Sequence, residues 1–371
     1  MAPNLLPAMR MPTRLSLVIL GLAAVNRLVA VLSVPVEELL TPRCSGCTGV
    51  VLYDHLAHSI LEQQQYSFNG LPSAEVPPLY PIVLAATYRM AGADNYLAMR
   101  LFQVVIGTGT TFMVGAIAQL LFGLHVSQLA EFLVATNPFL LFYTAELQTE
   151  TLFSFLAALG IYLCFKLRSA DGTSWRVVLA AGVVLGLTIL CRPTGLVLPI
   201  VWLAWLALVS RRHVVRVGGV VLIAALTIVP WMVRNATVFG RFISISANGF
   251  SNIAGYYVMR GYELSYTGPP LPEQYDEYGS ANPFAYLGDA ALEDYSRNLV
   301  LGHCRVRPQD CASAWVASFL HLWSPFISAE VYSLPVQIVA IGAYLPVLIL
   351  GIIGLGVAYK TTKVEAHHSF S

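Results

Sequence analysis

Residues 178–210 read VLAAGVVLGLTILCRPTGLVLPIVWLAWLALVS and contain one charged side chain, Arg192. The basic residues Arg211 and Arg212 follow directly. An apolar stretch of about 20 residues is long enough to cross a hydrocarbon layer of about 30 Å as a helix. Pro193 interrupts the run near its middle. The run therefore predicts two successive membrane spans, at 177–191 and 194–210, that meet at Arg192.

The same pattern extends over the whole chain. Of its 371 residues, 57% are hydrophobic and 11% are charged, whereas a soluble domain carries about 25% charged residues. One apolar block could be a signal peptide, but so many cannot. We predict an all-α polytopic membrane protein with about eight transmembrane helices: 15–34, 97–122, 128–144, 150–167, 177–191, 194–210, 216–233 and 336–358.

Loop charges predict the orientation. One set of connections is basic and includes every lysine of the chain: Arg10, Arg14, Lys166, Arg168, Arg176, Arg211, Arg212, Arg216, Lys360 and Lys363. The other connections, 35–96 and 234–335, contain most of the acidic residues. Short basic loops stay in the cytoplasm. We therefore expect both termini to be cytoplasmic and the two long acidic segments to lie on the outer face.

These assignments predict three regions. Residues 1–233 form a transmembrane module that includes the first outer loop, 35–96. Residues 234–335 form a small outer-face segment with a helix from Asp289 to His303, and residues 336–371 form the last span and tail. The apolar stretch 77–92 begins at Pro77 and carries Pro78 and Pro81, and counting it as a span would invert every later loop. We interpret it as an interfacial or re-entrant helix, with a tilted, broken span as the alternative.

Six cysteines divide between the two environments. Cys164 and Cys191 fall in predicted spans and are expected to be small buried hydrophobes. The other four fall in outer segments, where disulfides can form: Cys44, Cys47, Cys304 and Cys311. Three pairings are open to them. Local disulfides are favoured over a zinc site at Cys44 and Cys47.

Ionisable side chains at membrane depth are costly unless they are paired or hydrated, so each suggests a function. The predicted topology places Arg27, Glu150, Arg192 and Arg234 near the outer interface, beside the loop that contains Asp54. Their shared depth suggests a common cavity. The alternative is that they are snorkelling side chains or structural ion pairs at helix ends. His55 and His58 are a weak metal signal, because no third ligand is evident.

A family resemblance is carried by an ordered set of short motifs. They are Asp54 in the first outer loop, Pro77-Pro78-Leu79-Tyr80-Pro81, Leu121-Phe122-Gly123, Asn137-Pro138, Thr149-Glu150, Leu190-Cys191-Arg192-Pro193, Pro230-Trp231 through Asn235, and Phe239-Gly240-Arg241-Phe242. In this order the chain resembles the glycosyltransferase family 39 proteins of the GT-C class, close to bacterial mannosyltransferases and aminoarabinose transferases. The chain is short for that family, which leaves the acceptor type open.

The resemblance implies an enzyme that transfers a sugar from a polyprenyl-phosphate donor to an acceptor on the outer face. It implies that Asp54 and Glu150 are the catalytic acids. Asp54 would act as general base, and the donor phosphate would be bound by Arg192, Arg234 and Arg27. Substrate-binding residues would be Tyr80, Glu75 and His55. A single displacement with inversion is expected.

Several alternatives remain at this point. A transporter or lipid flippase could also use buried acids and arginines, and an inactive relative could act as a scaffold. No cofactor is certain, and a divalent metal is left open. The expected partners are the lipid-linked donor, a lipid, glycan or protein acceptor and the bilayer, but no nucleic acid. The expected location is a bacterial inner membrane, with the site facing the periplasm.

Overall fold

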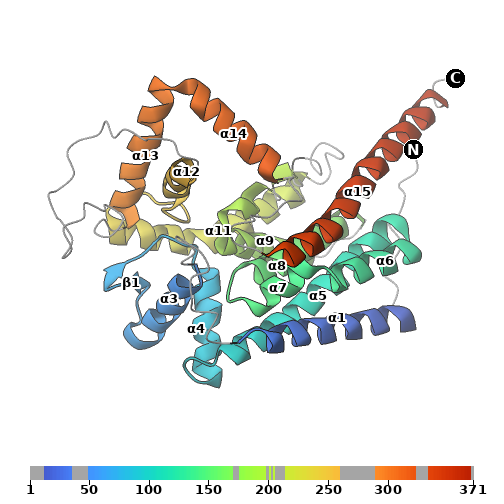
Figure 1. The fold of residues 1–371 in the computed structure, drawn as a ribbon, viewed down its shortest axis with the longest axis horizontal. Helices are drawn as coiled ribbons and strands as arrows, with labels where there is room; N and C mark the ends of the chain where they lie inside the picture. Colours follow the sequence, from blue (N-terminus) through green and yellow to red (C-terminus); the bar gives the residue numbers. More distant parts are fainter. Residues whose placement is uncertain are drawn as a thin grey trace. The chain divides into compact units, whose positions relative to one another are not determined.

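A computed structural model describes residues 12–35, 49–169, 175–197, 200–201, 204, 214–259, 289–322 and 333–368. Apart from one short hairpin, the described elements are helical (Figure 1). In chain order they are α1 (Arg14–Ser33), α3 (Gly49–Gln63), β1 (Ser67–Phe68), β2 (Leu71–Pro72), α4 (Leu79–Ala91), α5 (Tyr96–Phe122), α6 (Leu124–Ala135), α7 (Pro138–Ala145), α8 (Glu150–Ser169), α9 (Trp175–Cys191), η1 (Pro193–Leu196), α11 (Val214–Phe239), α12 (Gly249–Met259), α13 (Asp289–Val306), α14 (Pro308–Leu322) and α15 (Leu334–His368).

Within the described residues, five helices are long and apolar enough to cross a membrane: α1, α5, α8, α11 and α15. The helices α6 and α9 are apolar but shorter. Large hydrophobic side chains along these helices are exposed, such as Val18 on α1 and Val105 on α5, as expected for surfaces that face lipid. The predicted all-α polytopic membrane fold is confirmed.

One predicted span differs from a single continuous helix. The stretch 128–144 is divided between α6 and α7. Pro138 begins α7, a position that needs no backbone N–H. Most of the predicted span 194–210 lies outside the described residues, as do Cys44 and Cys47.

The transmembrane helices of the first compact unit, residues 1–136 and 140–311, pack in sequence. Helix α5 contacts α1, α6 and α8, and α9 packs between α8 and α11. Two glycines let α9 approach α11 closely. A Cβ atom on Gly182 would lie 2.5 Å from the Ile223 side chain, and one on Gly186 would lie 2.6 Å from Thr227. Small residues four apart are a common means of close helix packing in membranes.

Between α1 and α5, residues 49–95 pack against the helical bundle. Helices α3 and α4 pack together, joined by the antiparallel hairpin β1–β2. Asn69 and Gly70 form its turn with φ angles of 50° and 77°, the backbone that an Asn-Gly hairpin turn requires. The predicted interfacial helix is α4, which at 13 residues is too short to span a bilayer.

Helices α12 and α13 follow α11 and pack together. The Glu293 carboxylate on α13 accepts backbone N–H bonds from Phe250 and Ser251 at the start of α12, at 2.9–3.2 Å. Helix α13 confirms the helix expected from Asp289. A disulfide joins Cys304 to Cys311, while Cys164 and Cys191 are free and buried.

Residues 137–139 and 312–371 form a second compact unit. It contains most of α14 and the long helix α15, whose membrane-length part runs from Leu334 to Gly354. Leu350 and Ile352 on α15 are more than half exposed.

Candidate active site

Asp54 lies on the second turn of α3 and is only 7% exposed. The Tyr88 hydroxyl on α4 donates a hydrogen bond of 2.6 Å to its Oδ1. The Tyr96 hydroxyl on α5 lies 3.5 Å from Oδ2, which is long for a hydrogen bond. Three elements therefore fix one buried carboxylate. Burial and the Asp54 carboxylate both raise the pKa of Tyr88, so its phenol stays protonated and donates.

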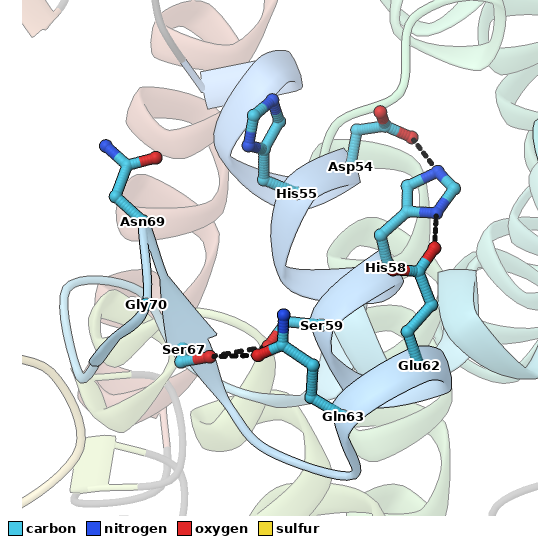
Figure 2. Close-up of a pocket in the computed structure, with 9 residues that line it drawn as sticks. All are labelled: Asp54, His55, His58, Ser59, Glu62, Gln63, Ser67, Asn69 and Gly70. Carbon is cyan, nitrogen blue, oxygen red and sulfur yellow. Dashed lines mark hydrogen bonds and ion pairs between the residues drawn. The ribbon is translucent and has the colours of Figure 1, made fainter.

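His58 is one helical turn after Asp54 and faces the same side of α3 (Figure 2). Its Nε2 lies 2.9 Å from Asp94 Oδ1 and 3.9 Å from Asp54 Oδ1. Its Nδ1 lies 3.4 Å from Glu62 Oε1. Burial lowers the pKa of His58, but the surrounding Asp54, Asp94 and Glu62 outweigh burial and raise it.

A solvent-connected cavity of about 410 Å³ opens beside these residues (Figure 2). Its lining comes from α3 and the β1–β2 hairpin: Asp54, His55, His58, Ser59, Glu62, Gln63, Ser67, Asn69 and Gly70. His55 points to the hairpin side, with its ring 5.5 Å from that of Phe68. The cavity thus combines one buried acid with polar side chains that face solvent.

Glu150 and Arg192 form a second polar centre. Arg192 Nη1 lies 2.5 Å from Glu150 Oε1 and 3.2 Å from Thr149 Oγ1. Glu150 begins α8, and Arg192 follows α9 in the extended conformation that precedes a proline. The guanidinium also lies 5.9 Å from the centre of the Phe153 ring. Of the four residues expected to share one cavity beside Asp54, the structure brings these two into direct contact, and none of the four lines the cavity beside Asp54.

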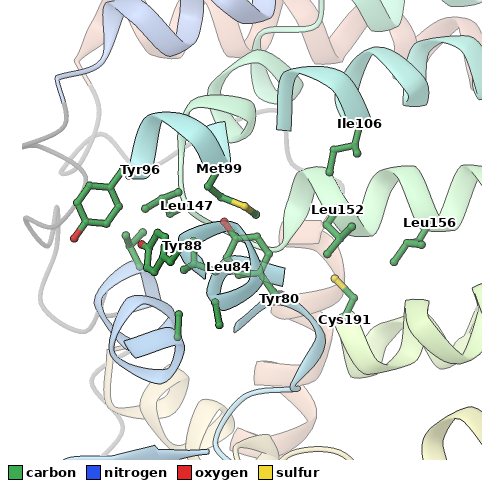
Figure 3. Close-up of a cluster of buried hydrophobic side chains, with 13 residues drawn as sticks. Tyr80, Leu84, Tyr88, Tyr96, Met99, Ile106, Leu147, Leu152, Leu156 and Cys191 are labelled. Atoms are coloured by element: carbon green, nitrogen blue, oxygen red, sulfur yellow. The ribbon is translucent and has the colours of Figure 1, made fainter. Parts of the chain in front are cut away.

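The two centres flank one hydrophobic core. Tyr53, next to Asp54 on α3, packs edge-on against Tyr80, with ring centres 5.1 Å apart. Burial, followed by the charge of Glu150, raises the pKa of Tyr53 to about 12. The core beneath it joins α3, α4, α5, α8 and the end of α9 (Figure 3): Tyr80, Leu84, Tyr88, Met99, Leu147, Leu152 and Cys191. Among the described ion pairs, none joins Asp54 to Arg192, the cation of the second centre.

The other two predicted phosphate-binding arginines lie elsewhere. Arg234, on α11, donates to the backbone carbonyls of Ser73 and Tyr66 at 2.7 and 2.8 Å, and its guanidinium lies 4.9 Å from the Trp231 ring centre. It anchors the hairpin segment. Arg27 is buried in α1, where its Nη1 donates to the Ala23 carbonyl at 3.1 Å.

Tyr80 and Glu75 complete the predicted residues. Tyr80 is fully buried, and its hydroxyl donates to Gln103 at 3.0 Å. Glu75 precedes α4, and burial together with the charge of Asp289 raises its pKa to about 7. The Asp289 carboxylate accepts bonds of 2.6–2.7 Å from the Ser73 hydroxyl and from the backbone N–H groups of Ala74 and Glu75. This contact ties α13 to the segment between β2 and α4.

Sequence reasoning missed several of these partners. Tyr88 and Tyr96 look like ordinary interface aromatics, and Asp94 looks like a turn residue. The four-residue spacing of Asp54 and His58 places both side chains on one face of a helix, and it is the one sequence signal for their proximity. Within the described residues, Asp54, His58 and Asp94 are the one group of acids, histidines and cysteines whose ligand atoms all lie within 4.8 Å and could hold a metal ion.

Comparison with known proteins now bears on the function. Residues 75–233, less than half of the chain, match the family described as dolichyl-phosphate-mannose-protein mannosyltransferase. The matched segment runs from Glu75 to Val233 inside α11 and includes Tyr80, Glu150 and Arg192, while Asp54 and Arg234 lie outside it. No curated protein and no solved structure matches the chain. The family match confirms the resemblance predicted from the sequence and supports a membrane glycosyltransferase of the GT-C type.

Proposed function

We propose that this protein transfers a sugar from a polyprenyl-phosphate donor to an acceptor at the non-cytoplasmic face of the membrane, with Asp54 as general base. The observation that carries the proposal is the buried Asp54 carboxylate at the edge of a solvent-connected cavity. A base that removes a proton in the transition state is commonly worth 10²–10⁴-fold in rate. The family match supports the transferase class, and the donor and base are our inference.

The reaction is a single displacement. The acceptor oxygen or nitrogen attacks the anomeric carbon, and its proton passes to Asp54. The bond from that carbon to the phosphate oxygen breaks, and polyprenyl phosphate leaves with the electron pair. Tyr88 holds the Asp54 carboxylate in one orientation for the attack. Attack opposite the leaving group inverts the anomeric centre.

Arg192 is the donor-phosphate ligand that we favour. Its side chain is 37% exposed, so a lipid headgroup can reach it. Arginine has five N–H donors, and the contacts to Glu150 and Thr149 use one nitrogen, Nη1. Glu150 fixes the guanidinium, and the positive charge stabilises the charge that develops on the leaving phosphate.

Arg234 and Arg27 take supporting places in this proposal. Arg234 holds the segment that leads to α4, so it shapes the cavity through the backbone. Arg27 braces α1 against Gly107 of α5. His55 lines the cavity, and Glu75 follows the hairpin in the chain without lining the cavity. Tyr80 supports Tyr53 from the core.

The cavity is proposed to face the periplasm of a bacterial inner membrane, with both termini cytoplasmic. The basic loops of the chain support this orientation. The disulfide between Cys304 and Cys311 supports an oxidising compartment for α13.

The experiment uses the purified protein in nanodiscs with radiolabelled dolichyl- or undecaprenyl-phosphate mannose. A transferase releases polyprenyl phosphate and moves the label to an added acceptor or to water. Asp54→Asn should slow this release. Its matched control is Asp294→Asn, which removes an exposed carboxylate of α13 and should leave release unchanged. Movement of the lipid across vesicles without release would instead indicate a transporter or flippase.

A further inference from the structure

Two carboxylates lie against one imidazole at the mouth of the cavity. Asp54 comes from α3 and Asp94 from the turn between α4 and α5, and both face His58 Nε2. In the described part of the chain, no arginine or lysine pairs with either acid. A buried carboxylate is stabilised by a positive partner. Asp54 is buried and the Asp94 side chain is 62% exposed, so the shortage of positive charge falls on Asp54, whose cationic partner would be His58 Nε2 at 3.9 Å.

The spacing of the three groups suits metal coordination. Zinc binds nitrogen and oxygen ligands at about 2.0–2.2 Å in a tetrahedral arrangement, so ligand atoms of one ion are about 3.3–3.6 Å apart. His58 Nε2 is 2.9 Å from Asp94 and 3.9 Å from Asp54. All three ligand atoms lie within 4.8 Å of one another. Small rotations of the three side chains would bring these ligand atoms around one ion.

The surroundings also resemble those of a metal ligand. A metal-bound histidine usually donates a hydrogen bond from its second ring nitrogen to a carboxylate. His58 Nδ1 lies 3.4 Å from the Glu62 carboxylate. Ligating carboxylates are themselves hydrogen-bonded, and Tyr88 donates to Asp54 at 2.6 Å. The cavity lined by Asp54, His58 and Glu62 gives an ion a route from solvent.

We propose that Asp54, His58 and Asp94 form a binding site for a divalent cation. The mixture of imidazole and carboxylate ligands favours Mn²⁺ or Zn²⁺ over Mg²⁺ or Ca²⁺. Three protein ligands leave further positions for water. The ion binds the Asp54 oxygen that faces His58, Oδ1, and Oδ2 stays directed to an acceptor. Ion binding is measured without turnover. The protein could therefore fail to bind an ion and still be a transferase, or bind an ion without being a transferase.

The test is a Mn²⁺ titration of the full-length protein in detergent after treatment with EDTA, with free Mn²⁺ followed by electron paramagnetic resonance. Mn²⁺ is the right probe because thiolates bind it weakly, so the cysteines do not compete. We expect one Mn²⁺ per chain. Asp94→Asn and His58→Gln should each weaken binding at least about tenfold. Zn²⁺ should displace the bound Mn²⁺.

The variants are chosen to preserve the fold. Asp94 has a φ of 59°, a conformation that asparagine tolerates well. His55→Gln is the matched control. His55 lines the same cavity but faces the hairpin, so the variant protein should bind Mn²⁺ as wild type does. Echo modulation from an imidazole nitrogen should be present in wild type and absent in His58→Gln.

Two outcomes would overturn the proposal. One is wild-type protein that binds no Mn²⁺ saturably. The other is binding that Asp94→Asn and His58→Gln leave unchanged while both variants unfold at the wild-type temperature.

Discussion

The Tyr88 hydroxyl and the Asp54 carboxylate are joined by a 2.6 Å hydrogen bond that links α4 to α3. The tyrosine comes from a helix of 13 residues, too short to span the membrane, and the acid comes from α3, between α1 and α4 in the chain. Their contact sets the orientation of the proposed base. It also uses the phenol as a donor, because its raised pKa keeps the proton on the oxygen.

Tyr88→Phe should therefore lower kcat about tenfold and leave KM for the donor nearly unchanged. The ring remains in the core, and only the hydrogen bond is lost, which costs about 1–3 kcal/mol when a charged partner stays buried. Steady-state release of polyprenyl phosphate measures the effect. An unchanged kcat would show that this bond does not position the base.

Arg192→Gln should raise KM for the lipid-linked donor at least tenfold, since the proposed phosphate contact is lost. Arg192→Lys keeps the charge but loses the planar fork, so it should recover only part of the affinity. Donor binding to nanodisc-embedded protein gives a direct measurement. Equal affinity in wild type and Arg192→Gln would remove Arg192 from the donor site.

Much of this arrangement can be predicted from residue type. The bounds of α1, α5 and α8 fall close to the predicted spans 15–34, 97–122 and 150–167 because long apolar runs have few alternatives. Asp54, Glu150 and Arg192 stand out because charge near a membrane is costly.

The rest depends on contacts that a sequence does not show. Asp94 reaches His58 only because α4 folds back on α3. Arg100 begins the second span, yet its guanidinium is buried against the backbone carbonyls of Val31 and Val34. Arg234, predicted as a phosphate ligand, makes its contacts with the hairpin backbone and with aromatic rings. Side-chain partners of this kind follow from tertiary packing.

Stability should fall as pH rises from about 4.5 to about 7, through Glu75. Its folded pKa of about 7 exceeds the ordinary value of 4.5, so over this range the folded state binds more protons than the unfolded state. The contribution is at most about 3 kcal/mol. Glu75→Gln should therefore gain more stability over wild type at pH 8 than at pH 5. Unfolding temperatures at both pH values measure this difference, and a constant difference would exclude Glu75 as the cause.

Gly182→Ala should destabilise the contact between α9 and α11 by about 1–3 kcal/mol, because the new methyl group overlaps Ile223. The matched control is Gly218→Ala on α11, where nothing lies within 4 Å of the added atom. That change should be neutral or slightly stabilising. Thermal unfolding in the same detergent compares the two, and equal effects would contradict the close packing.

The central claim is tested by single-turnover release of polyprenyl phosphate from wild type and Asp54→Asn, at saturating donor and with matched unfolding temperatures. The account predicts a fall of about 10²–10⁴-fold in rate, with donor binding retained. Release from Asp54→Asn at the wild-type rate would contradict it.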